Sequence, residues 1–428
     1  MKDRSYLAYR QPRRVVVTGV GAISPLGADA ASTWRGLLTG GCGVRQLTGP
    51  EFAGLPVRIA ATAAAEPADQ LTRTQARTVS RNAQFALLAA REAWADAGFG
   101  RVAIGGGELD ARRVGVSMGT IIGGTGALVT ADRVLSARGA RFVSPHTAPM
   151  TVPSGAAAQV AIDLGIRGEA RTVVSGCASG AEAIGEAIDR IRHGRLDVVL
   201  AGGTEAMITP EVLAAFAAMR ALAPGTDGLR AASRPFDKDR SGFVLGEGAG
   251  LLVLEAEEHA LARGARIYCE AAGWGLSVDA HDMAAPRPDG EGVIDAIRKA
   301  LADADGEAAD VVHVNAHATA TLSGDAAEAA ALRTVFGSGL DGVPVTASKG
   351  ALGHMQGAAG AVEAIASVLT LHHGLIPPTV GCENPDDGIG LDIVLGTPRT
   401  LATTGDLVLS NSYGFGGHNA VLAFRRSD

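Results

Sequence analysis

The chain has 428 residues, of which 47% are hydrophobic and 19% charged, so it is long enough for two or three domains and too apolar for a disordered protein. Its 38 basic and 45 acidic residues give a net charge of −7 without a basic block, which argues against a nucleic-acid partner. No stretch approaches the roughly 18 consecutive apolar residues of a membrane-spanning helix, so no membrane association is expected.

Short β-branched runs alternate with alanine-rich segments of helical periodicity along the whole chain. The predicted strands are Arg14–Val20, Arg113–Met118, Thr172–Ser175, Asp197–Ala201, Ala249–Glu255, Ile267–Gly273, Val311–Asn315, Val343–Ala347, Leu407–Asn411 and Ala420–Phe424. The predicted helices are Ser80–Ala97, Ala178–His193, Glu257–Arg263, Val293–Ala302, Asp325–Phe336 and Gln356–His373. Strands that alternate with helices predict an α/β fold built from parallel βαβ units, with helices on both faces of the sheet.

Two similar segments indicate that the fold is duplicated. Residues 177–194 and 354–374 each follow a strand and a tight loop, begin on a potentially reactive side chain and end at His-Gly. We therefore expect two halves, residues 13–264 and 265–428, related by a pseudo-twofold axis. Both segments are rich in glycine and alanine, which lets backbones approach closely, so we expect both helices to be central and buried.

Cys177 stands directly after a predicted strand and at the start of a predicted helix. The free N–H groups and positive dipole end of a helix favour thiolate, so a lowered pKa is expected there. This context is typical of a nucleophile, although many cysteines are simply small buried apolar residues. The other three cysteines, Cys42, Cys269 and Cys382, form no CxxC pair, which predicts a reducing, cytoplasmic location and no zinc site.

Three more loops carry polar residues that could serve chemistry. One contains His317 in the sequence VNAHATATLSGD, and another contains Lys349 and His354 in ASKGALGHMQGAAG. Metal binding by the two histidines is a weak interpretation, because no spacing such as HExxH supports it, and no metal is expected. The glycines of the third loop, NSYGFGGHN, could expose backbone N–H groups for an oxyanion hole, or form an ordinary tight hairpin.

Taken together, these loops resemble the elongating β-ketoacyl-acyl carrier protein synthases, most closely synthase II of type II fatty acid synthesis. Five motifs stand in the family order over almost the whole chain: SGCASGAEAIG, SRPFDKDRSGFVLGEGAG, NAHATATLSGD, SKGALGHMQGAAG and GFGGHN. The resemblance implies the duplicated thiolase fold, with helix–sheet–helix–sheet–helix layers and pseudo-twofold symmetry.

The resemblance also implies a role for each matching residue. Cys177 is expected to be the nucleophile that takes the acyl chain. His317 and His354 match the paired histidines that act on malonyl-carrier protein, and Lys349 matches the lysine that supports them electrostatically. Phe415 matches the gating phenylalanine, and its backbone N–H would complete an oxyanion hole with that of Cys177.

Further matches concern the surroundings of these catalytic positions. Three acidic residues match positions that brace the histidine and the lysine: Asp325, Glu328 and Glu363. Three residues match positions that bind substrate: Thr319 and Thr321 on the pantetheine arm, and Ile122, which narrows the acyl pocket at the dimer interface.

The activity implied by the resemblance is decarboxylating Claisen condensation of malonyl-acyl carrier protein with an acyl chain held on Cys177, in fatty acid or related polyketide elongation. The expected partners are acyl carrier protein and a second copy of the chain in a homodimer. No cofactor is expected, since the substrates bring phosphopantetheine with the carrier.

Other interpretations remain beside this one. The chain could be a ketosynthase subunit of specialised metabolism that works with a partner chain. A degradative thiolase is disfavoured because NSYGFGGHN holds no second cysteine, and an initiating synthase because that class uses Cys-His-Asn. A non-catalytic chain-length factor would lack the nucleophile, and Cys177 argues against it.

Overall fold

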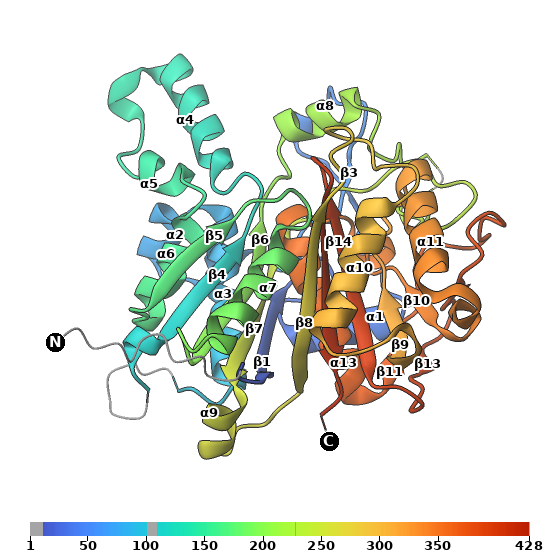
Figure 1. Cartoon of the computed structure of the whole chain (residues 1–428). Coiled ribbons are helices and arrows are strands. Elements are labelled where there is room, and N and C mark those ends of the chain that lie inside the picture. Colours follow the sequence, from blue (N-terminus) through green and yellow to red (C-terminus); the bar gives the residue numbers. More distant parts are fainter. Residues whose placement is uncertain (1–11, 101–108, 227, 428) are drawn as a thin grey trace.

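The computed structural model describes residues 12–100, 109–226 and 228–427 (Figure 1). The first half contributes five main strands: β1 (Val15–Ile23), β4 (Val114–Gly119), β5 (Glu169–Val173), β6 (Val198–Glu205) and β7 (Gly248–Ala256). The second half contributes five more: β8 (Cys269–Val278), β9 (Val311–Asn315), β10 (Pro344–Thr346), β14 (Leu407–Gly414) and β15 (His418–Arg425). The sequence predicted all ten, with ends that differ by a few residues.

The strand order repeats between the halves. The ladder runs β12-β10-β9-β14-β15-β8-β1-β7-β6-β4-β5, where β12 (Asp392–Ile393) is a short addition at one edge. We number the five main strands of each half in chain order and read each half from its outer edge toward the junction between the halves. Both halves then give the order third, second, fourth, fifth, first. The halves join where β1 pairs with β8 in antiparallel orientation. This arrangement is the pseudo-twofold symmetry of the thiolase fold.

The prediction of parallel units holds for only part of each half. The second strand pairs in parallel with its neighbours on both sides, as β4 does with β5 and β6 and β9 does with β10 and β14. Apart from the parallel pair of β10 with the short edge strand β12, the remaining pairs of the ladder, such as β6 with β7 and β14 with β15, are antiparallel. The reason is visible in β14 and β15, which follow each other through a tight turn that leaves no room for a crossover helix.

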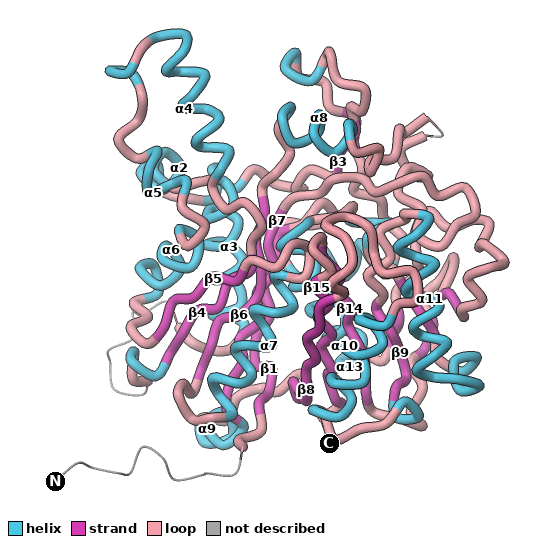
Figure 2. Tube along the Cα trace, turned by 45° about the horizontal axis from the view of Figure 1, so that its top comes forward, coloured by secondary structure: helices cyan, strands magenta, loops and turns pink. Residues whose placement is uncertain are grey.

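Helices lie outside and between the two sets of strands (Figures 1 and 2). The longer helices are α1 (Ala30–Leu38), α3 (Arg81–Asp96), α4 (Thr125–Arg138), α6 (Gly155–Leu164), α7 (Ser179–Arg192), α8 (Pro210–Ala218), α10 (Glu291–Asp303), α11 (Leu322–Phe336) and α13 (Ala359–His373). The short ones are α2 (Arg73–Thr78), α5 (Thr147–Thr151), α9 (Glu257–Ala262) and α12 (Lys349–Leu352). Two-stranded ladders pair β2 (Arg45–Gln46) with β3 (Ile59–Ala60) and β11 (Leu375–Ile376) with β13 (Arg399–Thr400).

The central layer consists of α7 and α13. Helix α7 contacts β4 and β6 of the first half and β8 and β15 of the second, while α13 contacts β6, β7 and β14. On the outside, α3 covers the first sheet and α10, backed by α11, covers the second. The two central helices meet at glycines: a Cβ at Gly180 would lie 2.7 Å from the carbonyl oxygen of Gly357. The small residues of both segments therefore serve this close approach, as expected.

The fold gathers the predicted reactive loops at one end of the strands. Cys177 follows β5, His317 follows β9, Lys349 follows β10 and Phe415 follows β14. These strands belong to the parallel ladders of the two halves, whose carboxyl ends are the usual place for ligand sites in α/β folds. No helix in the described part of the chain is long and apolar enough to cross a membrane.

Candidate active site

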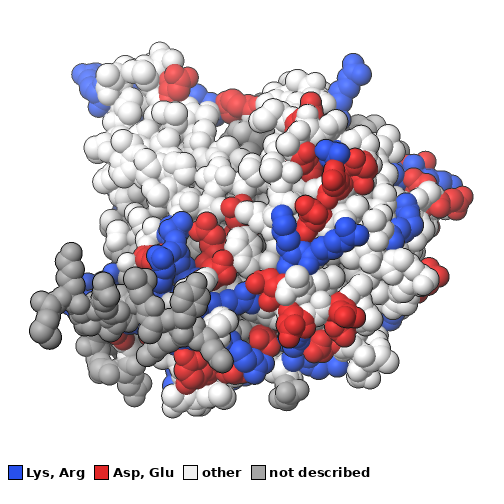
Figure 3. Space-filling view, in the orientation of Figure 1, with Lys and Arg blue, Asp and Glu red and all other residues white. Residues whose placement is uncertain are grey.

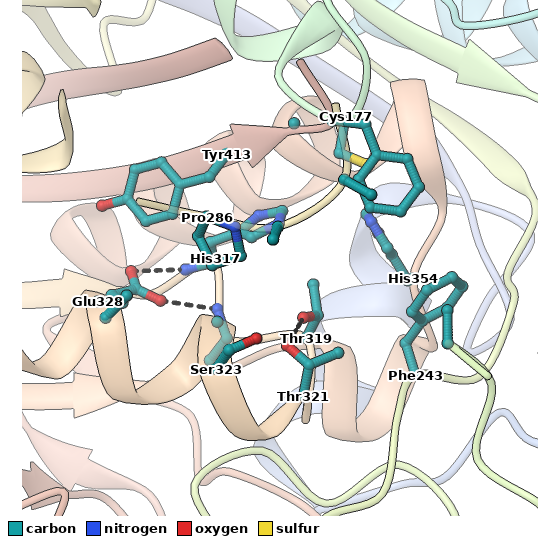
Figure 4. A pocket seen from close by; sticks show the side chains of 18 of the residues that line it. Cys177, Phe243, Pro286, His317, Thr319, Thr321, Ser323, Glu328, His354 and Tyr413 are labelled. Atoms are coloured by element: carbon teal, nitrogen blue, oxygen red, sulfur yellow. Dashed lines mark hydrogen bonds between the residues drawn. The ribbon is translucent and has the colours of Figure 1, made fainter. Parts of the chain in front are cut away.

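Cys177 lies in the tight turn that leads into the central helix α7. Gly176 precedes it with φ of 59°, a left-handed conformation that suits glycine. The side chain of Cys177 is only 6% exposed, and its Sγ donates to Oε1 of Gln356 at 3.4 Å. Cys177, His317 and His354 face the same cavity (Figure 4).

The environment of Cys177 overturns the expectation of a lowered pKa. Burial raises the pKa of the thiol to about 12, although the Lys349 charge and hydrogen bonds from the backbone N–H groups of Phe415 and Cys177 act in the opposite direction. Loss of water on burial outweighs these opposing effects. Cys177 is therefore a neutral thiol at physiological pH.

The two histidines form a perpendicular pair beside the cysteine. Their ring centroids lie 5.5 Å apart with an interplanar angle of 85°, and Phe243 packs edge-on against His354. Burial lowers the pKa of both imidazoles well below 6.5, and the charge of Lys349 lowers it further. Both rings are therefore neutral at physiological pH.

A backbone contact sets the tautomer of His354. The N–H of Gln356 donates to His354 Nδ1 at 3.3 Å, so Nδ1 is the acceptor and the ring proton resides on Nε2. A neutral imidazole with a fixed N–H is suited to donate a hydrogen bond to a developing oxyanion.

The decarboxylation that the sequence resemblance implies should depend little on pH if it uses these two neutral rings. If the imidazoles kept the usual pKa, half would be protonated near about pH 6.5. Because their pKa values are lower, we expect the decarboxylation rate constant to change by less than about twofold between about pH 8 and pH 6. The same shift means that the folded state binds fewer protons than the unfolded state below about pH 6.5, so the pair contributes less stability as the pH falls. Carbon dioxide release measured across this range, with circular dichroism as a control for folding, checks the expectation; a titration centred near pH 6.5 would contradict it.

The predicted acidic residues brace the loop backbone of His317. Glu328 accepts hydrogen bonds from the backbone N–H groups of His317 at 2.9 Å and Ala318 at 2.8 Å (Figure 4). It also accepts from Asn411 Nδ2 at 3.0 Å. This carboxylate therefore fixes the position of the histidine through the main chain rather than through its ring.

Asp325 acts in the same way on a neighbouring turn. It accepts from the N–H of Ala320 at 3.1 Å and from that of Phe236 at 2.8 Å, and the Arg240 guanidinium lies 3.8 Å away. Ala320 has φ of 65°, so this hydrogen bond holds a turn that a residue with a side chain rarely adopts.

Lys349 and Glu363 form a buried ion pair behind the cavity. The ammonium lies 2.6 Å from the Glu363 carboxylate, which α13 supplies, and both side chains are almost fully buried. Burial raises the pKa of Glu363, and the ammonium opposes this shift. Lys349 does not line the cavity, but its charge acts on Cys177, His317 and His354.

Replacing Lys349 by arginine should be poorly tolerated. Arginine is bulkier, and its planar fork cannot take the place of a compact ammonium in a filled site, so overpacking should cost roughly 1–3 kcal/mol of stability. We expect at least a tenfold loss of decarboxylation as well. Lys299→Arg, at an exposed position on α10, is the matched control and should leave both unchanged. A fully active Lys349→Arg protein would show that the compact ammonium is not needed.

The cavity in front of Cys177 has a volume of about 480 Å³. Thr319 and Thr321, whose hydroxyls lie 3.1 Å apart, form one wall. Phe415 is 38% exposed and also lines the cavity, and it lies in the tight turn that joins β14 to β15; its part in an oxyanion hole stays a prediction. Ile122 does not line the cavity; it packs, partly buried, against a neighbouring apolar cluster.

Sequence reasoning missed two residues of this site. Gln356 lies within a quoted motif and contacts Cys177, and Asn411 anchors Glu328. The only sequence signal for Gln356 was its position two residues after His354. Within residues 12–100, 109–226 and 228–427, no cluster of three or more His, Cys, Asp or Glu side chains could hold a metal ion.

A cysteine at the start of a central helix, faced by two neutral histidines in a duplicated thiolase fold, defines an acyltransferase. The family comparison agrees with this class. The model "Beta-ketoacyl synthase, N-terminal domain" matches residues 12–260, and "Beta-ketoacyl synthase, C-terminal domain" matches residues 268–383. The chain belongs to the β-ketoacyl synthase family, which confirms the resemblance found in the sequence.

Individual relatives are similar over nearly the full length. 3-Oxoacyl-[acyl-carrier-protein] synthase 2 of Staphylococcus aureus (strain COL) is 41% identical over 417 residues, which are 97% of this chain and 99% of the relative. The protein of the same name from Synechocystis is 40% identical, covering 98% and 100%.

Solved structures of ketosynthases share the fold. A type II PKS acyl-carrier protein in complex with its ketosynthase bound to the hexaketide, AntDE:AntF, has a TM-score of 0.89 and 31% identity, covering 98% of this chain and 100% of that one. The ishigamide ketosynthase/chain length factor has a TM-score of 0.88 and 35% identity, covering 97% and 100%.

Proposed function

We propose that the protein is a 3-oxoacyl-acyl carrier protein synthase that condenses malonyl-acyl carrier protein with an acyl chain held on Cys177. The observation that carries the proposal is the meeting of Cys177, His317 and His354 on one cavity, with both imidazoles neutral. The names of the curated relatives support the same reaction.

In the first half-reaction, Cys177 attacks the thioester of an acyl chain on its carrier. The C–S bond to the carrier breaks, a new C–S bond to Sγ forms, and the thiol proton ends on the released carrier thiol. The backbone N–H groups of Cys177 and Phe415 are proposed to hold the tetrahedral oxyanion. The products are an acyl-enzyme and free carrier, so ping-pong kinetics are expected.

In the second half-reaction, malonyl-carrier protein replaces the first carrier. The bond to the carboxylate breaks, carbon dioxide leaves, and the electron pair remains as an enolate whose oxygen accepts from the imidazole N–H groups of His317 and His354. The enolate carbon then attacks the acyl-Cys177 carbonyl, the new C–C bond forms, and Sγ leaves as a thiolate that takes up one proton from solvent to restore the thiol. Release of carbon dioxide drives this step, so the proposal requires no cofactor beyond the phosphopantetheine of the carrier.

The remaining expectations about the site belong to this proposal. Lys349, with Glu363, sets the electrostatic environment of the histidine pair, while Glu328 and Asp325 position its loop. Three residues are proposed to bind substrate: Thr319 and Thr321 on the pantetheine arm, and Ile122 in an acyl pocket at the dimer interface, outside the cavity of Cys177 in the single chain.

A direct test of the proposal is acylation of the protein by acyl-carrier protein. Intact mass spectrometry after mixing should show one acyl group per chain, and peptide mapping should place it on Cys177. An unmodified protein, or an adduct on another residue, would contradict the proposed function.

A second candidate is a ketosynthase subunit of specialised metabolism that works with a partner chain. Two similar solved structures support it: a ketosynthase with its acyl-carrier protein and hexaketide, and a ketosynthase/chain length factor. A degradative thiolase is disfavoured, because Cys382 is buried in a cluster of the second half and does not line the cavity of Cys177.

We also propose that the chain forms a homodimer through the face built by α4, α5, α6 and β5. Six apolar side chains are exposed on this face and around it: Leu128, Leu135, Phe142, Val152, Ile162 and Val174. Figure 3 shows few charged atoms over α4 and α5, and β5 is the last strand of the ladder. An apolar patch beside a sheet edge is typical of a surface that a second subunit covers.

The dimer should depend on this face. Light scattering is expected to give twice the chain mass of 43.3 kDa, and Ile162→Arg should shift the protein toward the monomer. Leu261→Arg is the matched control, because Leu261 is a comparably exposed apolar residue on α9, away from this face. A wild-type mass near that of one chain would contradict the proposal.

Two further expectations stay proposals. The division into halves at residues 264 and 265 is supported by the repeated strand order. A cytoplasmic location is supported by the four cysteines, all of which are free thiols.

A further inference from the structure

Gln356 contacts both the nucleophile and one of its histidines. Its Oε1 accepts from Cys177 Sγ at 3.4 Å, and its backbone N–H donates to His354 Nδ1 at 3.3 Å. The residue is 2% exposed and has φ of 53°, a left-handed conformation that residues with a side chain rarely adopt. Such outliers concentrate where function requires them.

The other end of the Gln356 amide lacks a partner. Nε2 is buried and makes no hydrogen bond to any residue in the described part of the chain. Gln356 lines the cavity together with Cys177 and His354, so its amide lies close to the place where a chain on Cys177 would begin. Holding the thiol requires only Oε1, because the S–H group is a donor. The free donor on Nε2 therefore calls for an acceptor that the protein does not supply.

Acylation of Cys177 leaves both polar atoms of the Gln356 amide without a hydrogen-bond partner. The S–H donor disappears when the thioester forms, so Oε1 loses its partner while Nε2 still has none. The only acceptor that a saturated chain brings is its thioester carbonyl, which the backbone N–H groups of Cys177 and Phe415 are proposed to hold, so it leaves nothing for the amide. A chain with an oxygen on its third carbon offers an acceptor, and the amide, 3.4 Å from Sγ, lies beside the first carbons of any chain on that sulfur.

We propose that Gln356 is a specificity-determining residue that selects acyl chains with an oxygen close to the thioester, as in unreduced polyketide chains, over saturated chains. The inference rests on the proposed function, since it requires an acyl group on Cys177. It narrows the substrate class of the same site.

The test compares two carrier-bound primers of equal length, a 3-oxoacyl chain and a saturated one. Single-turnover acylation of Cys177 is followed by intact mass spectrometry for the wild type and for Gln356→Met, which keeps the side-chain length and removes the amide. We expect the wild type to prefer the 3-oxo primer by about tenfold or more, because a buried donor left without a partner disfavours the saturated chain. Gln356→Met should reduce this preference to nearly equal rates for the two primers, because no amide is left to discriminate between them.

Thr319→Val is the matched control. It removes a polar group from another wall of the same cavity and should change both primers by the same factor. An unchanged primer ratio in Gln356→Met, whether or not both rates fall together, would overturn the inference and leave Gln356 as a positioning residue for the thiol. If no primer acylates the wild type, the proposed function itself fails and the inference falls with it, so the two failures are distinguishable.

Discussion

Replacing Cys177 by alanine is expected to abolish acyl-enzyme formation and to lower condensation by at least about a thousandfold. The substitution removes the only thiol that lines the cavity within the described residues, so no thioester can form there. The swap is small and apolar in a buried turn, so the fold should remain intact. Intact mass spectrometry with acyl-carrier protein and an assay for the condensation product give the two readouts.

Cys382→Ala is the matched control for this result. Cys382 is buried like Cys177 but packs in an apolar cluster outside the cavity, and its thiol has a pKa raised to about 12 by burial as well. The control should acylate at the wild-type rate. Condensation retained by Cys177→Ala would remove Cys177 from the role of nucleophile.

His354→Ala should separate the two half-reactions. The enolate oxygen exists only after malonyl-carrier protein has lost carbon dioxide, so the N–H on His354 Nε2 contributes mainly to that step. Removing one donor of an oxyanion site lowers rates by about 100- to 1,000-fold in other enzymes, and we expect a loss of this size in decarboxylation. Acylation of Cys177 should fall much less. His317→Ala should behave in the same way.

The control for the histidines is His372→Ala. His372 is exposed in the last turn of α13, at the opposite end of this helix from the loop that carries His354. Removing its imidazole should affect neither half-reaction. Carbon dioxide release and acyl-enzyme formation are measured separately for each variant. Equal losses in both half-reactions for His354→Ala would mean that the histidine acts on the cysteine or the fold rather than on the enolate.

Much of the fold could be predicted because each half repeats the same signals. The periodicity of the sequence predicts strands such as Val311–Asn315 and the two glycine- and alanine-rich helices, and the structure has them at the expected residues. The parallel or antiparallel direction of each strand could not be predicted, because periodicity carries no information about it. Helix α4 was missed because most of its residues are exposed and it has no continuous apolar face.

The site was predictable in its residues but not in its electrostatics. Cys177, His317, Lys349 and His354 occur in motifs, and the fold brings them together. The pKa of Cys177 could not be foreseen, because it depends on how completely packing removes water from the sulfur, and burial outweighs the helix N-terminus. The role of Gln356 depends on a left-handed backbone conformation that its residue type does not indicate.

The most direct test of the account is condensation itself. The purified protein is first acylated with an acyl-carrier protein, freed of excess substrate and then mixed with malonyl-carrier protein. The account predicts that the acyl group leaves Cys177 as one equivalent of carbon dioxide is released, and that the carrier gains a 3-oxoacyl chain two carbons longer than the primer. Release of the acyl group as free acid, or carbon dioxide without a longer product on the carrier, would contradict it.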